Sequence, residues 1–469
     1  MTIATCLPPK SPDLLLSKYG GPVPRYTSYP TAPHFDGAVD AALYREWLGQ
    51  LPADRTVSLY FHIPFCDTLC WFCGCQTKIT KRYEPVAAYL DRLDREIAMV
   101  REAAGGARLP VAHIHWGGGS PTLLVPDDIG RLARMIDRDF ARTEDCEFAV
   151  EIDPRDIGPA TVDALADAGV TRASLGLQDA DPAIQHAINR VQPLAETAAL
   201  VEELRIAGVR SLNLDLMYGL PHQTTAHVLA TIDQALRMEP DRIALFGYAH
   251  VPWMRPHQRM IPEAALPGPS ERLAQAQAAA AALMDAGFVP IGFDHFARPD
   301  DPMARALARG ALRRNFQGYT TDGAETLIGI GASAIGRLPQ GYVQNDAATG
   351  RYLAAIDDGA FATARGHALS GDDRLMGAAI ERLLCDFEVD LPALAHAHGK
   401  PADAFTDACA RLAPMIMDGL VLVQAGRLIV SDSGRPFVRR IAACFDAYLG
   451  TPAPAAAATD RAPRHSVAV

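Results

Sequence analysis

The stretch that decides the fold is VSLYFHIPFCDTLCWFCGC, residues 57–75, where a short apolar run leads directly into a cysteine-rich loop. The run at 57–63 is followed by proline, which is typical of a buried β-strand rather than of a helix. The chain has nine cysteines, and this loop holds four of them, spaced Cys66-x3-Cys70-x2-Cys73-x-Cys75. The stretch therefore predicts a strand with a thiol-rich loop at its carboxyl end.

Short apolar runs of the same kind recur along the chain, at 57–63, 111–117, 147–153, 172–178, 211–219 and 242–249. The segments between them, such as EPVAAYLDRLDREIAMVREAA at 84–104, place apolar residues every three or four positions and predict helices. Strands that alternate with helices indicate βαβ units and a parallel sheet. Six units are too few for a closed eight-stranded barrel, so we expect an α/β fold with a partial (β/α)6 barrel.

Polar residues and glycines gather where the predicted strands end. Ligands of parallel sheets bind at the carboxyl ends of the strands. The residues in those positions are His62 and the cysteine loop, Gly117–Ser120, Glu151, Asp153, Gln178, Asp215, Tyr218 and Tyr248–His250. Since all six strands contribute, we expect a single site along this edge of the sheet.

We assign the barrel region, with its extension, to residues 51–365. The composition and the predicted elements differ on either side of it. Residues 1–50 form an N-terminal arm rich in Pro and Tyr, with the stretch PVPRYTSYPTA. Residues 366–450 combine helices with LVLVQAGRLIVS at 420–431, a hairpin that turns at Ala-Gly, and predict a small helical, winged-helix-like domain. The tail at 451–469 is expected to be disordered.

Composition and charge exclude several classes of function. The apolar content of 49% and charged content of 21% are those of an ordinary soluble globular protein. The net charge is −11 without a dense Lys/Arg run, which argues against a nucleic-acid partner. There is no apolar signal core, and no run approaches the roughly 20 apolar residues of a membrane span. We expect a cytoplasmic protein without membrane partners, and, without heptads, a monomer.

Clustered cysteines in a cytoplasmic protein can bind zinc, form a redox-active disulfide or hold an iron–sulfur cluster. These three kinds of site fit the spacing in this loop to different degrees. A structural zinc ion usually takes two well-separated ligand pairs, and here all four thiols crowd one loop. A redox-active disulfide fits less well, because the cytoplasm keeps thiols reduced and aromatic residues surround the C-x2-C pair. An iron–sulfur cluster fits best, since three thiolates leave one iron open to another ligand. Gly74 makes the backbone permissive, so spacing alone leaves open whether Cys75 is a fourth ligand.

The loop Cys66-x3-Cys70-x2-Cys73, with an aromatic at Phe72, resembles the signature of the radical S-adenosylmethionine (SAM) enzymes. In that family three cysteines hold a 4Fe-4S cluster, and SAM binds the fourth iron. WGGGSPT at 116–122 resembles the glycine-rich stretch that meets the methionyl end of SAM. About residues 15–445 more closely resemble the oxygen-independent coproporphyrinogen III oxidases of haem biosynthesis, on the motifs PRYTSYPTA, YFHIPFC, CGC, HWGGGSPT, EIDPRD, GLQD, INR, NLDLMYGLP, GYAHVPW and NFQGYTT.

The resemblance implies a role for each matching position. Cys66, Cys70 and Cys73 would be the metal ligands. The cluster-bound SAM would contact Tyr60, Gly118, Glu151 and Ile335. A second SAM would contact Phe72, Gly119, Ser120, Gln178, Arg190, Asp215 and Ala249, where Ser120 stands in place of the family's usual Thr. Cys75 marks the oxidase group, so we expect Cys75 and Tyr60 to be catalytic, with Cys75 outside the cluster.

The implied reaction is oxidative decarboxylation of two propionates of coproporphyrinogen III, on ring A and then ring B, giving protoporphyrinogen IX. A 5′-deoxyadenosyl radical would abstract the hydrogen, with electrons from a donor such as a flavodoxin or ferredoxin. Arginines apt to bind the substrate carboxylates are Arg25, Arg255, Arg259, Arg313 and Arg314. Two alternatives remain: a haem-chaperone-like radical SAM protein, a group that lacks Cys75 and the long arm, and a zinc-stabilised α/β binding module.

Overall fold

The computed structural model describes residues 10–449, and its centre is a sheet of twelve strands in the order β16-β15-β14-β13-β1-β4-β5-β6-β7-β8-β10-β9. The strands from β13 to β8 in this order are all parallel to their neighbours. Six of them are the strands predicted from the sequence: β1 (Val57–Ile63), β4 (Pro110–Gly118), β5 (Ala141–Ile152), β6 (Arg172–Gln178), β7 (Ser211–Tyr218) and β8 (Arg242–Gly247). The predicted partial (β/α)6 barrel is confirmed.

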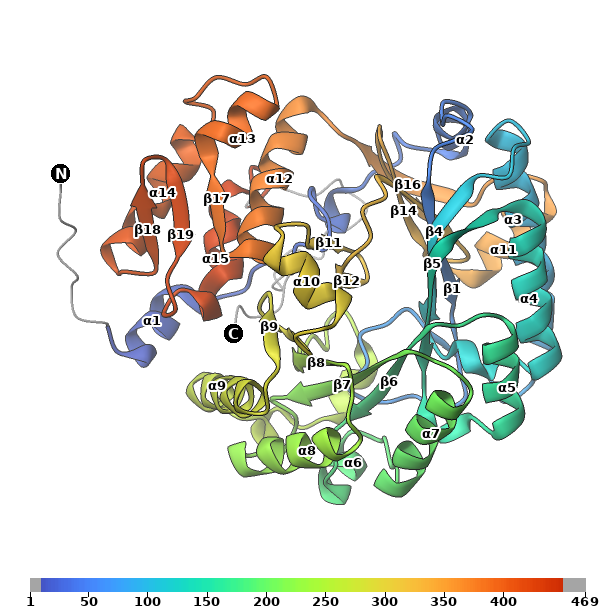
Figure 1. Cartoon of the computed structure of the whole chain (residues 1–469), viewed down its shortest axis with the longest axis horizontal. Helices are drawn as coiled ribbons and strands as arrows, with labels where there is room; N and C mark the ends of the chain where they lie inside the picture. The colour runs from blue at the N-terminus through green and yellow to red at the C-terminus, as the bar shows by residue number, and fades with distance from the viewer. Residues whose placement is uncertain (1–9, 450–469) are drawn as a thin grey trace.

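Helices cover the outer face of the curved sheet (Figure 1). They are α3 (Glu84–Ala103), α4 (Pro126–Asp139), α5 (Pro159–Asp167), α6 (Pro182–Ala187), α7 (Leu194–Ile206), α8 (Thr225–Arg237) and α9 (Pro269–Asp285). Their apolar faces form the main core with the strands, and Ile97, Leu132 and Leu204 are completely buried there. Short 3-10 turns connect several elements: η1 (Ala32–His34), η2 (Pro121–Leu123), η3 (Pro154–Asp156), η4 (Pro256–Met260), η5 (Glu263–Ala265), η6 (Arg435–Phe437) and η7 (Ala443–Phe445).

The sheet is longer than the sequence predicted at both ends. Beyond β1 it continues through β13 (Thr326–Ile330) into the antiparallel strands β14 (Ile335–Leu338), β15 (Gly341–Asn345) and β16 (Thr363–Ala368). Beyond β8 it adds the antiparallel pair β9 (Val289–Ile291) and β10 (His295–Ala297). These strands are three to six residues long, too short for a periodic signal.

Smaller elements flank the sheet. Two parallel stubs, β2 (Phe65–Cys66) and β3 (Lys78–Ile79), bracket the cysteine loop. The hairpin β11 (Arg313–Asn315) and β12 (Gly318–Thr320) lies between the barrel and the C-terminal part of the chain (Figure 1). The helices α10 (Pro302–Ala308) and α11 (Thr349–Asp357) precede and follow this region.

The C-terminal part has its own hydrophobic core, apart from the barrel core. It contains α12 (Gly371–Asp386), α13 (Leu391–Ala397), α14 (Thr406–Met417), α15 (Val438–Ala442) and a small sheet of β17 (Glu388–Asp390), β19 (Arg427–Val430) and β18 (Val421–Gln424). The predicted hairpin is β18–β19, and Ala425 and Gly426 both have positive φ, as a two-residue hairpin turn requires.

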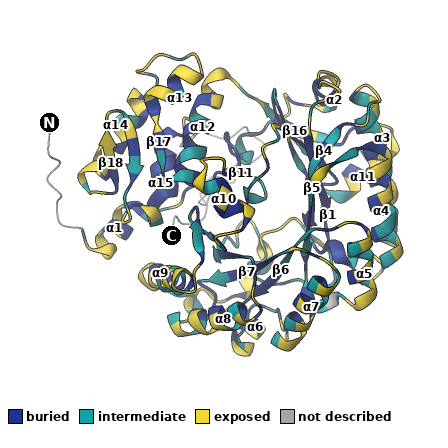
Figure 2. Ribbon diagram, viewed as in Figure 1, coloured by how far each residue is buried: buried dark blue, intermediate teal, exposed yellow. Residues whose placement is uncertain are grey.

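The N-terminal arm contacts both cores. Its helix α1 (Pro12–Tyr19) and the side chains of Val23 and Tyr26 are buried in the C-terminal core, whereas α2 (Ala41–Gly49) lies against the barrel. In Figure 2 the barrel sheet is mostly buried, whereas the helices around it carry exposed residues on their outer sides. The tail predicted to be disordered lies outside the described residues. Among residues 10–449, no helix combines the length and the hydropathy needed to cross a bilayer.

Candidate active site

A pocket at the carboxyl ends of the barrel strands contains the cysteine loop, as the strand ends predicted. Its cavity volume is about 150 Å³, and it is partly open to solvent. The residues around it come from the cysteine loop and from β4, β5, β6 and β7, or follow them directly: Cys66, Thr68, Leu69, Cys70, Phe72, Cys73, Cys75, Thr77, Gly118, Gly119, Glu151, Ile152, Asp153, Ser174, Gly176, Gln178, Arg190 and Asp215. The three predicted metal ligands thus share one pocket with most of the predicted SAM contacts.

Segments distant in sequence hold the cysteine loop in place. The Trp71 N–H donates to the Ile188 carbonyl at 2.9 Å. The 3-10 turn η4 supplies two more bonds, from His257 Nε2 to the Cys73 carbonyl at 2.8 Å and from Gln258 Nε2 to the Phe72 carbonyl at 3.0 Å. Sequence reasoning did not identify these supports, because nothing local to His257 or Gln258 indicates contact with a loop so far away.

Two arginines place positive charge on the innermost cysteine. The guanidinium groups of Arg155 and Arg190 donate to Cys70 Sγ at 3.3 and 3.4 Å. Asp153 fixes both arginines, at 2.6 Å from Arg155 Nη2 and 3.1 Å from Arg190 Nη1. Burial alone would raise the pKa of Asp153, but the two guanidinium groups lower it. Cys70 Sγ is thus held by two cationic donors that are themselves fixed by one carboxylate. Arg155 stands in the EIDPRD motif but was not among the predicted site residues.

The other thiols differ in exposure and in proton affinity. Cys66 and Cys73 are half-buried and Cys75 is exposed. Burial raises the pKa of Cys66 to about 12. Cys73 and Cys75 share a hydrogen bond, which lowers the pKa of Cys73 to about 7 and raises that of Cys75. In this pair Cys73 is therefore the thiol that ionises first.

The donor set fits a four-iron cluster better than a single metal ion. A single zinc ion needs all its sulfurs about 2.3 Å from one point. No three His, Cys, Asp or Glu side chains in residues 10–449 are grouped closely enough for that. A cluster binds each thiolate to a different iron, so its ligands surround a larger volume. Three thiols lining one pocket, with cations at Cys70, match that requirement.

The glycine-rich segment passes unusually close to its neighbours. Gly118 has φ +106°, and a Cβ there would lie 2.4 Å from the His62 ring. A Cβ on Gly119 would lie 2.5 Å from the Phe65 carbonyl oxygen. The Gly119 N–H donates to the Ile63 carbonyl at 2.9 Å, and the Ser120 N–H donates to the Phe65 carbonyl at 2.7 Å. Glycine is thus required for this segment to lie against the strand that carries the cysteine loop.

Glu151 lies at the junction of the glycine segment and the barrel interior. Its carboxylate accepts hydrogen bonds from the Gly118 N–H at 3.0 Å and from His115 Nε2 at 3.1 Å. Burial alone would raise the pKa of Glu151, but these partners lower it, so the group is ionised at neutral pH. A fixed carboxylate at the pocket wall can bind the ammonium group of an amino-acid moiety.

The pocket is also lined by Ser174, Arg190 and Asp215, and these polar side chains retain capacity for further hydrogen bonds. Arg190 is 6% exposed, and its Nε has no hydrogen-bond partner among the described residues. The Asp215 carboxylate accepts from Asn213 Nδ2 at 2.7 Å and lies 3.3 Å from Ser174 Oγ. Burial and the nearby Glu151 charge raise the pKa of Asp215 to about 6. This part of the pocket can therefore receive a further polar ligand.

Four predicted cofactor contacts lie outside the pocket lining. The Tyr60 hydroxyl donates to His62 Nδ1 at 2.9 Å, and burial raises its pKa well above the usual value. Ser120 is buried, with its Oγ 3.1 Å from Thr122 Oγ1. Ala249 follows β8, and Ile335 begins β14. The structure thus brings together Cys66, Cys70, Cys73, Cys75, Phe72, Gly118, Gly119, Glu151, Gln178, Arg190 and Asp215.

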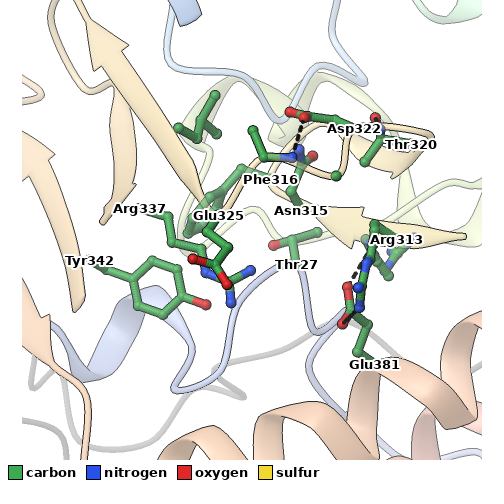
Figure 3. Close-up of a pocket in the computed structure, with 14 residues that line it drawn as sticks. Thr27, Arg313, Asn315, Phe316, Thr320, Asp322, Glu325, Arg337, Tyr342 and Glu381 are labelled. Carbon is green, nitrogen blue, oxygen red and sulfur yellow. Dashed lines mark hydrogen bonds and ion pairs between the residues drawn. The ribbon is translucent and has the colours of Figure 1, made fainter. Parts of the chain in front are cut away.

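A second pocket lies between the β11–β12 hairpin, α12 and the strands β14 and β15 (Figure 3). It contains no cysteine. Of its cations, Arg313 pairs with Glu381 at 3.4 Å and Arg337 lies beside Glu325, whereas Arg314 Nε and Nη1 have no hydrogen-bond partner among the described residues. Because no thiol lines this pocket, we place the reaction centre at the cysteine pocket.

Known proteins resemble the chain over nearly its whole length. A model of the Radical SAM superfamily matches residues 60–235. The oxygen-independent coproporphyrinogen III oxidase of Bradyrhizobium diazoefficiens is 50% identical over 93% of this chain and 97% of its own length. That of Paracoccus denitrificans is 48% identical over 92% and 96%. The solved structure of a coproporphyrinogen III oxidase from Escherichia coli, described as a radical SAM enzyme, matches with a TM-score of 0.87 at 38% identity, over 93% of this chain and 99% of that one. The chain therefore belongs to the oxygen-independent coproporphyrinogen III oxidases of the radical SAM superfamily.

Proposed function

We propose that this chain converts coproporphyrinogen III to protoporphyrinogen IX without oxygen, by oxidative decarboxylation of two propionate side chains in haem biosynthesis. The observation that carries the proposal is the 50% identity over 97% of a relative that bears this activity in its name. The pocket agrees, since its cysteine loop and polar walls lie at the strand edge where a parallel barrel binds its ligands.

Cys66, Cys70 and Cys73 would hold one 4Fe-4S cluster, and Tyr60, Gly118, Glu151 and Ile335 would contact the SAM bound to it. When bound, cluster and SAM supply the 5′-deoxyadenosyl radical that takes a hydrogen atom from the propionate β-carbon, after which CO2 and one electron leave. The chain's own contribution is positional. Glu151 is ionised and accepts a hydrogen bond from His115, and Arg155 and Arg190 donate hydrogen bonds to Cys70 Sγ.

A second SAM would be bound by Phe72, Gly119, Ser120, Gln178, Arg190, Asp215 and Ala249. Its support is that Phe72, Gly119, Gln178, Arg190 and Asp215 line the same pocket, and that Arg190 Nε has no partner in the described part of the chain. Equilibrium dialysis with labelled SAM tests this directly. Two SAM per cluster in the wild type, and one in Asp215→Ala, are expected; one in both would contradict a second site.

Cys75 and Tyr60 are the proposed catalytic residues. Cys75 lines the pocket beside Cys73 but is the exposed thiol of the pair. Tyr60 keeps its proton at neutral pH because burial raises its pKa. We further propose a cytoplasmic monomer that receives electrons from a flavodoxin or ferredoxin and binds neither nucleic acid nor membrane, in line with the net charge of −11.

The test is an anaerobic assay of reconstituted protein with coproporphyrinogen III, SAM and a reductant. Protoporphyrinogen IX, methionine and 5′-deoxyadenosine should accumulate together. Stoichiometric haem binding without product would instead support the haem-chaperone-like alternative. Fewer than about three irons per chain after reconstitution would contradict the cluster and favour the zinc-stabilised binding module.

A further inference from the structure

Arginines from four distant segments meet beside the carboxyl ends of β7 and β8. They are Arg25 in the N-terminal arm, Arg272 in the first turn of α9, Arg314 in β11 and Arg439 in α15. Contacts place them together. Arg25 Nη2 donates to the Gly247 carbonyl, and the Arg272 guanidinium lies against the same glycine. Arg314 Nη2 donates to the Arg25 carbonyl, and Arg314 and Arg439 both lie over the Phe293 ring. We call Arg25, Arg272 and Arg314 the arginine cluster; Arg439 adds charge behind it.

Arg272 is the member whose burial is hardest to explain by folding alone. It is 9% exposed, and its guanidinium makes no hydrogen bond or ion pair with any residue in the range 10–449. It lies against Gly219 and Gly247, where a Cβ would be 2.5 and 3.3 Å from its Nη1 and Nη2, and it sits 5.8 Å from the centre of the Tyr218 ring. Burial lowers its pKa. A buried cation without a counter-charge destabilises a fold unless a ligand supplies one.

Arg314 shows the same pattern. It is 8% exposed, and neither its Nε nor its Nη1 has a hydrogen-bond partner in the described residues. Its Nη2 donates to the Arg25 carbonyl at 3.3 Å. The guanidinium lies 4.8 Å from the Phe293 ring centre and 4.5 Å from that of Tyr319. These rings fix the plane of the guanidinium and leave two donor nitrogens for another acceptor.

Within residues 10–449, the carboxylates near the cluster already have partners: Glu381 accepts from the Arg314 backbone N–H at 3.1 Å and pairs with Arg313. Asp294 is the carboxylate whose charge interacts with Arg25 and Arg314, and it is already hydrogen-bonded to His295 at 2.6 Å. Arg25 itself is half-buried, with its Nη2 on the Gly247 carbonyl at 3.0 Å. Burial and the Arg25 charge lower the pKa of Arg439 to about 9. Among the described residues, the three guanidinium groups of the arginine cluster therefore outnumber the carboxylates beside them, inside a protein whose net charge is −11.

Strand β7 connects the cluster to the cysteine pocket. Asp215 lines that pocket and lies on β7, three residues before Tyr218, on whose ring Arg272 rests. His295 and Asp215 both pair with Ala244 of β8, and His295 bonds to Asp294 of the cluster region. A ligand large enough to reach from the pocket to the cluster would bring its acidic groups to the arginines.

We propose that the arginine cluster is a carboxylate-binding subsite that holds the porphyrinogen propionates that are not decarboxylated. This rests on the proposed function, because it assumes a porphyrinogen in the pocket. The reacting propionate must lie at the cysteine pocket, so carboxylates held beside β7 and β8 are those that survive in the product. Guanidinium groups bind carboxylates bidentately, and two with unused donors can hold two propionates.

The other arginines that the sequence suggested are less suitable. Arg259 is exposed, Arg313 is exposed and pairs with Glu381 at 3.4 Å, and Arg255 donates to Gln76 Oε1 at 2.8 Å. Of the five, the structure keeps Arg25 and Arg314, and it adds Arg272, which lies in no motif recognised in the sequence.

Binding of two oxidised porphyrins tests the subsite without turnover. Coproporphyrin III carries four propionates, and protoporphyrin IX carries the two that survive the reaction. Arg272→Gln and Arg314→Gln are each expected to weaken binding by about 10- to 100-fold, the effect of losing a charged hydrogen-bonded contact. The loss should be equal for both porphyrins. A loss confined to coproporphyrin III would mean that the cluster holds the reacting propionates, and no loss would overturn the subsite.

Kinetics and a matched control separate this role from a structural one. Both variants should raise KM for coproporphyrinogen III with little change in kcat and with unchanged iron content, and Arg272→Lys should restore part of the binding. Arg298→Gln is the control: Arg298 also lies on an aromatic ring, at 5.4 Å from Phe288, but beside the amino end of β8. It should leave porphyrin binding unchanged, and a loss equal to that of Arg272→Gln would overturn the proposal.

Fold stability and activity give two further readouts. Arg272→Gln is expected to lower the Tm little, because only the contact with the Tyr218 ring is lost and no hydrogen bond or ion pair within residues 10–449 is broken. A large decrease would mean a structural role. If wild-type protein binds both porphyrins and the variants do not, but no protoporphyrinogen forms, the proposed function fails while the subsite stands. If the wild type makes product and the variants bind normally, the subsite alone fails.

Discussion

Cys73 and Cys75 lie side by side in the pocket, one residue apart, yet we expect their thiols to act differently. The Cys75 N–H donates to Cys73 Sγ at 3.4 Å, an arrangement that stabilises Cys73 as thiolate. Spacing alone left the role of Cys75 open, because Gly74 gives the backbone the freedom to turn either sulfur toward a metal. The local hydrogen bond between the two residues, which only the structure shows, distinguishes them.

Cys75→Ser is therefore predicted to retain its iron and sulfide and to lose at least about 100-fold in product formation. Cys73→Ser should lose the cluster itself. Iron and sulfide analysis with the visible spectrum measures the cluster content of both variants. The anaerobic assay measures product formation. A Cys75→Ser protein without iron would place Cys75 among the ligands.

Asp215 gives a pH-dependent prediction. Its pKa rises from 3.8 to about 6 on folding, so the folded protein binds more protons than the unfolded chain between these values. The favourable contribution of protonated Asp215 is present below about pH 4 and is lost as the pH rises through 6. Asp215→Asn does not titrate, so the Tm of the SAM-free variant relative to wild type should increase from pH 4 to pH 7. The difference amounts to at most about 3 kcal/mol in unfolding free energy. A difference independent of pH would contradict the shift.

At the scale of elements, a buried carboxylate joins α3 to the strands that extend the barrel. Glu96 is 1% exposed and accepts hydrogen bonds from the Gly331 N–H at 2.8 Å, Asn345 Nδ2 at 2.7 Å and the Tyr352 hydroxyl at 2.7 Å. These partners follow β13, end β15 and lie in α11. The helix was predicted from its period, but its link to β13–β15 depends on residues more than two hundred positions away.

Glu96→Ala is predicted to lower the free energy of unfolding by about 2–4 kcal/mol, because three buried donors lose their acceptor. Glu96→Gln should cost less, since its carbonyl oxygen still accepts. Denaturant unfolding measures both. Glu102→Ala is the matched control on the same helix, at an exposed position, and should stay within about 0.5 kcal/mol of wild type. Equal effects of Glu96→Ala and Glu102→Ala would refute the link.

At the scale of the whole molecule, the N-terminal arm joins the two cores and carries Arg25 to the arginine cluster. Tyr26 is 4% exposed in the C-terminal core, and its hydroxyl donates to Asp446 Oδ2 at 2.9 Å. The neighbouring Arg25 reaches the carboxyl end of β8. The arm thus couples the position of a proposed substrate contact to the packing of the C-terminal part.

Tyr26→Ala is predicted to cost about 3–5 kcal/mol of stability, as for other large-to-small changes in a core. It should also raise KM for coproporphyrinogen III while leaving iron content unchanged, because the cluster loop belongs to the barrel. Tyr26→Phe keeps the ring, so its effect on KM should be small. Thermal unfolding, iron analysis and KM together test this, and loss of iron from Tyr26→Ala would show that the two parts are not separable in this way.

The sequence by itself determined the six barrel strands, the helices between them, the β18–β19 hairpin and the cysteine loop. These features have local causes: apolar runs, helical periods, an Ala-Gly turn and closely spaced thiols. Comparison of motifs then indicated the family, and the relatives confirm it.

Only the tertiary structure decided the short strands β9, β10 and β13–β16, the cation pair at Cys70, the η4 support and the arginine cluster. Each depends on groups that are distant in sequence and meet only when the chain is folded. Arg272 illustrates the reason: in the sequence it is one of many helical arginines, and only its buried position without a counter-charge distinguishes it. Local pattern reports what a segment can form, whereas burial and charge balance depend on everything packed around it.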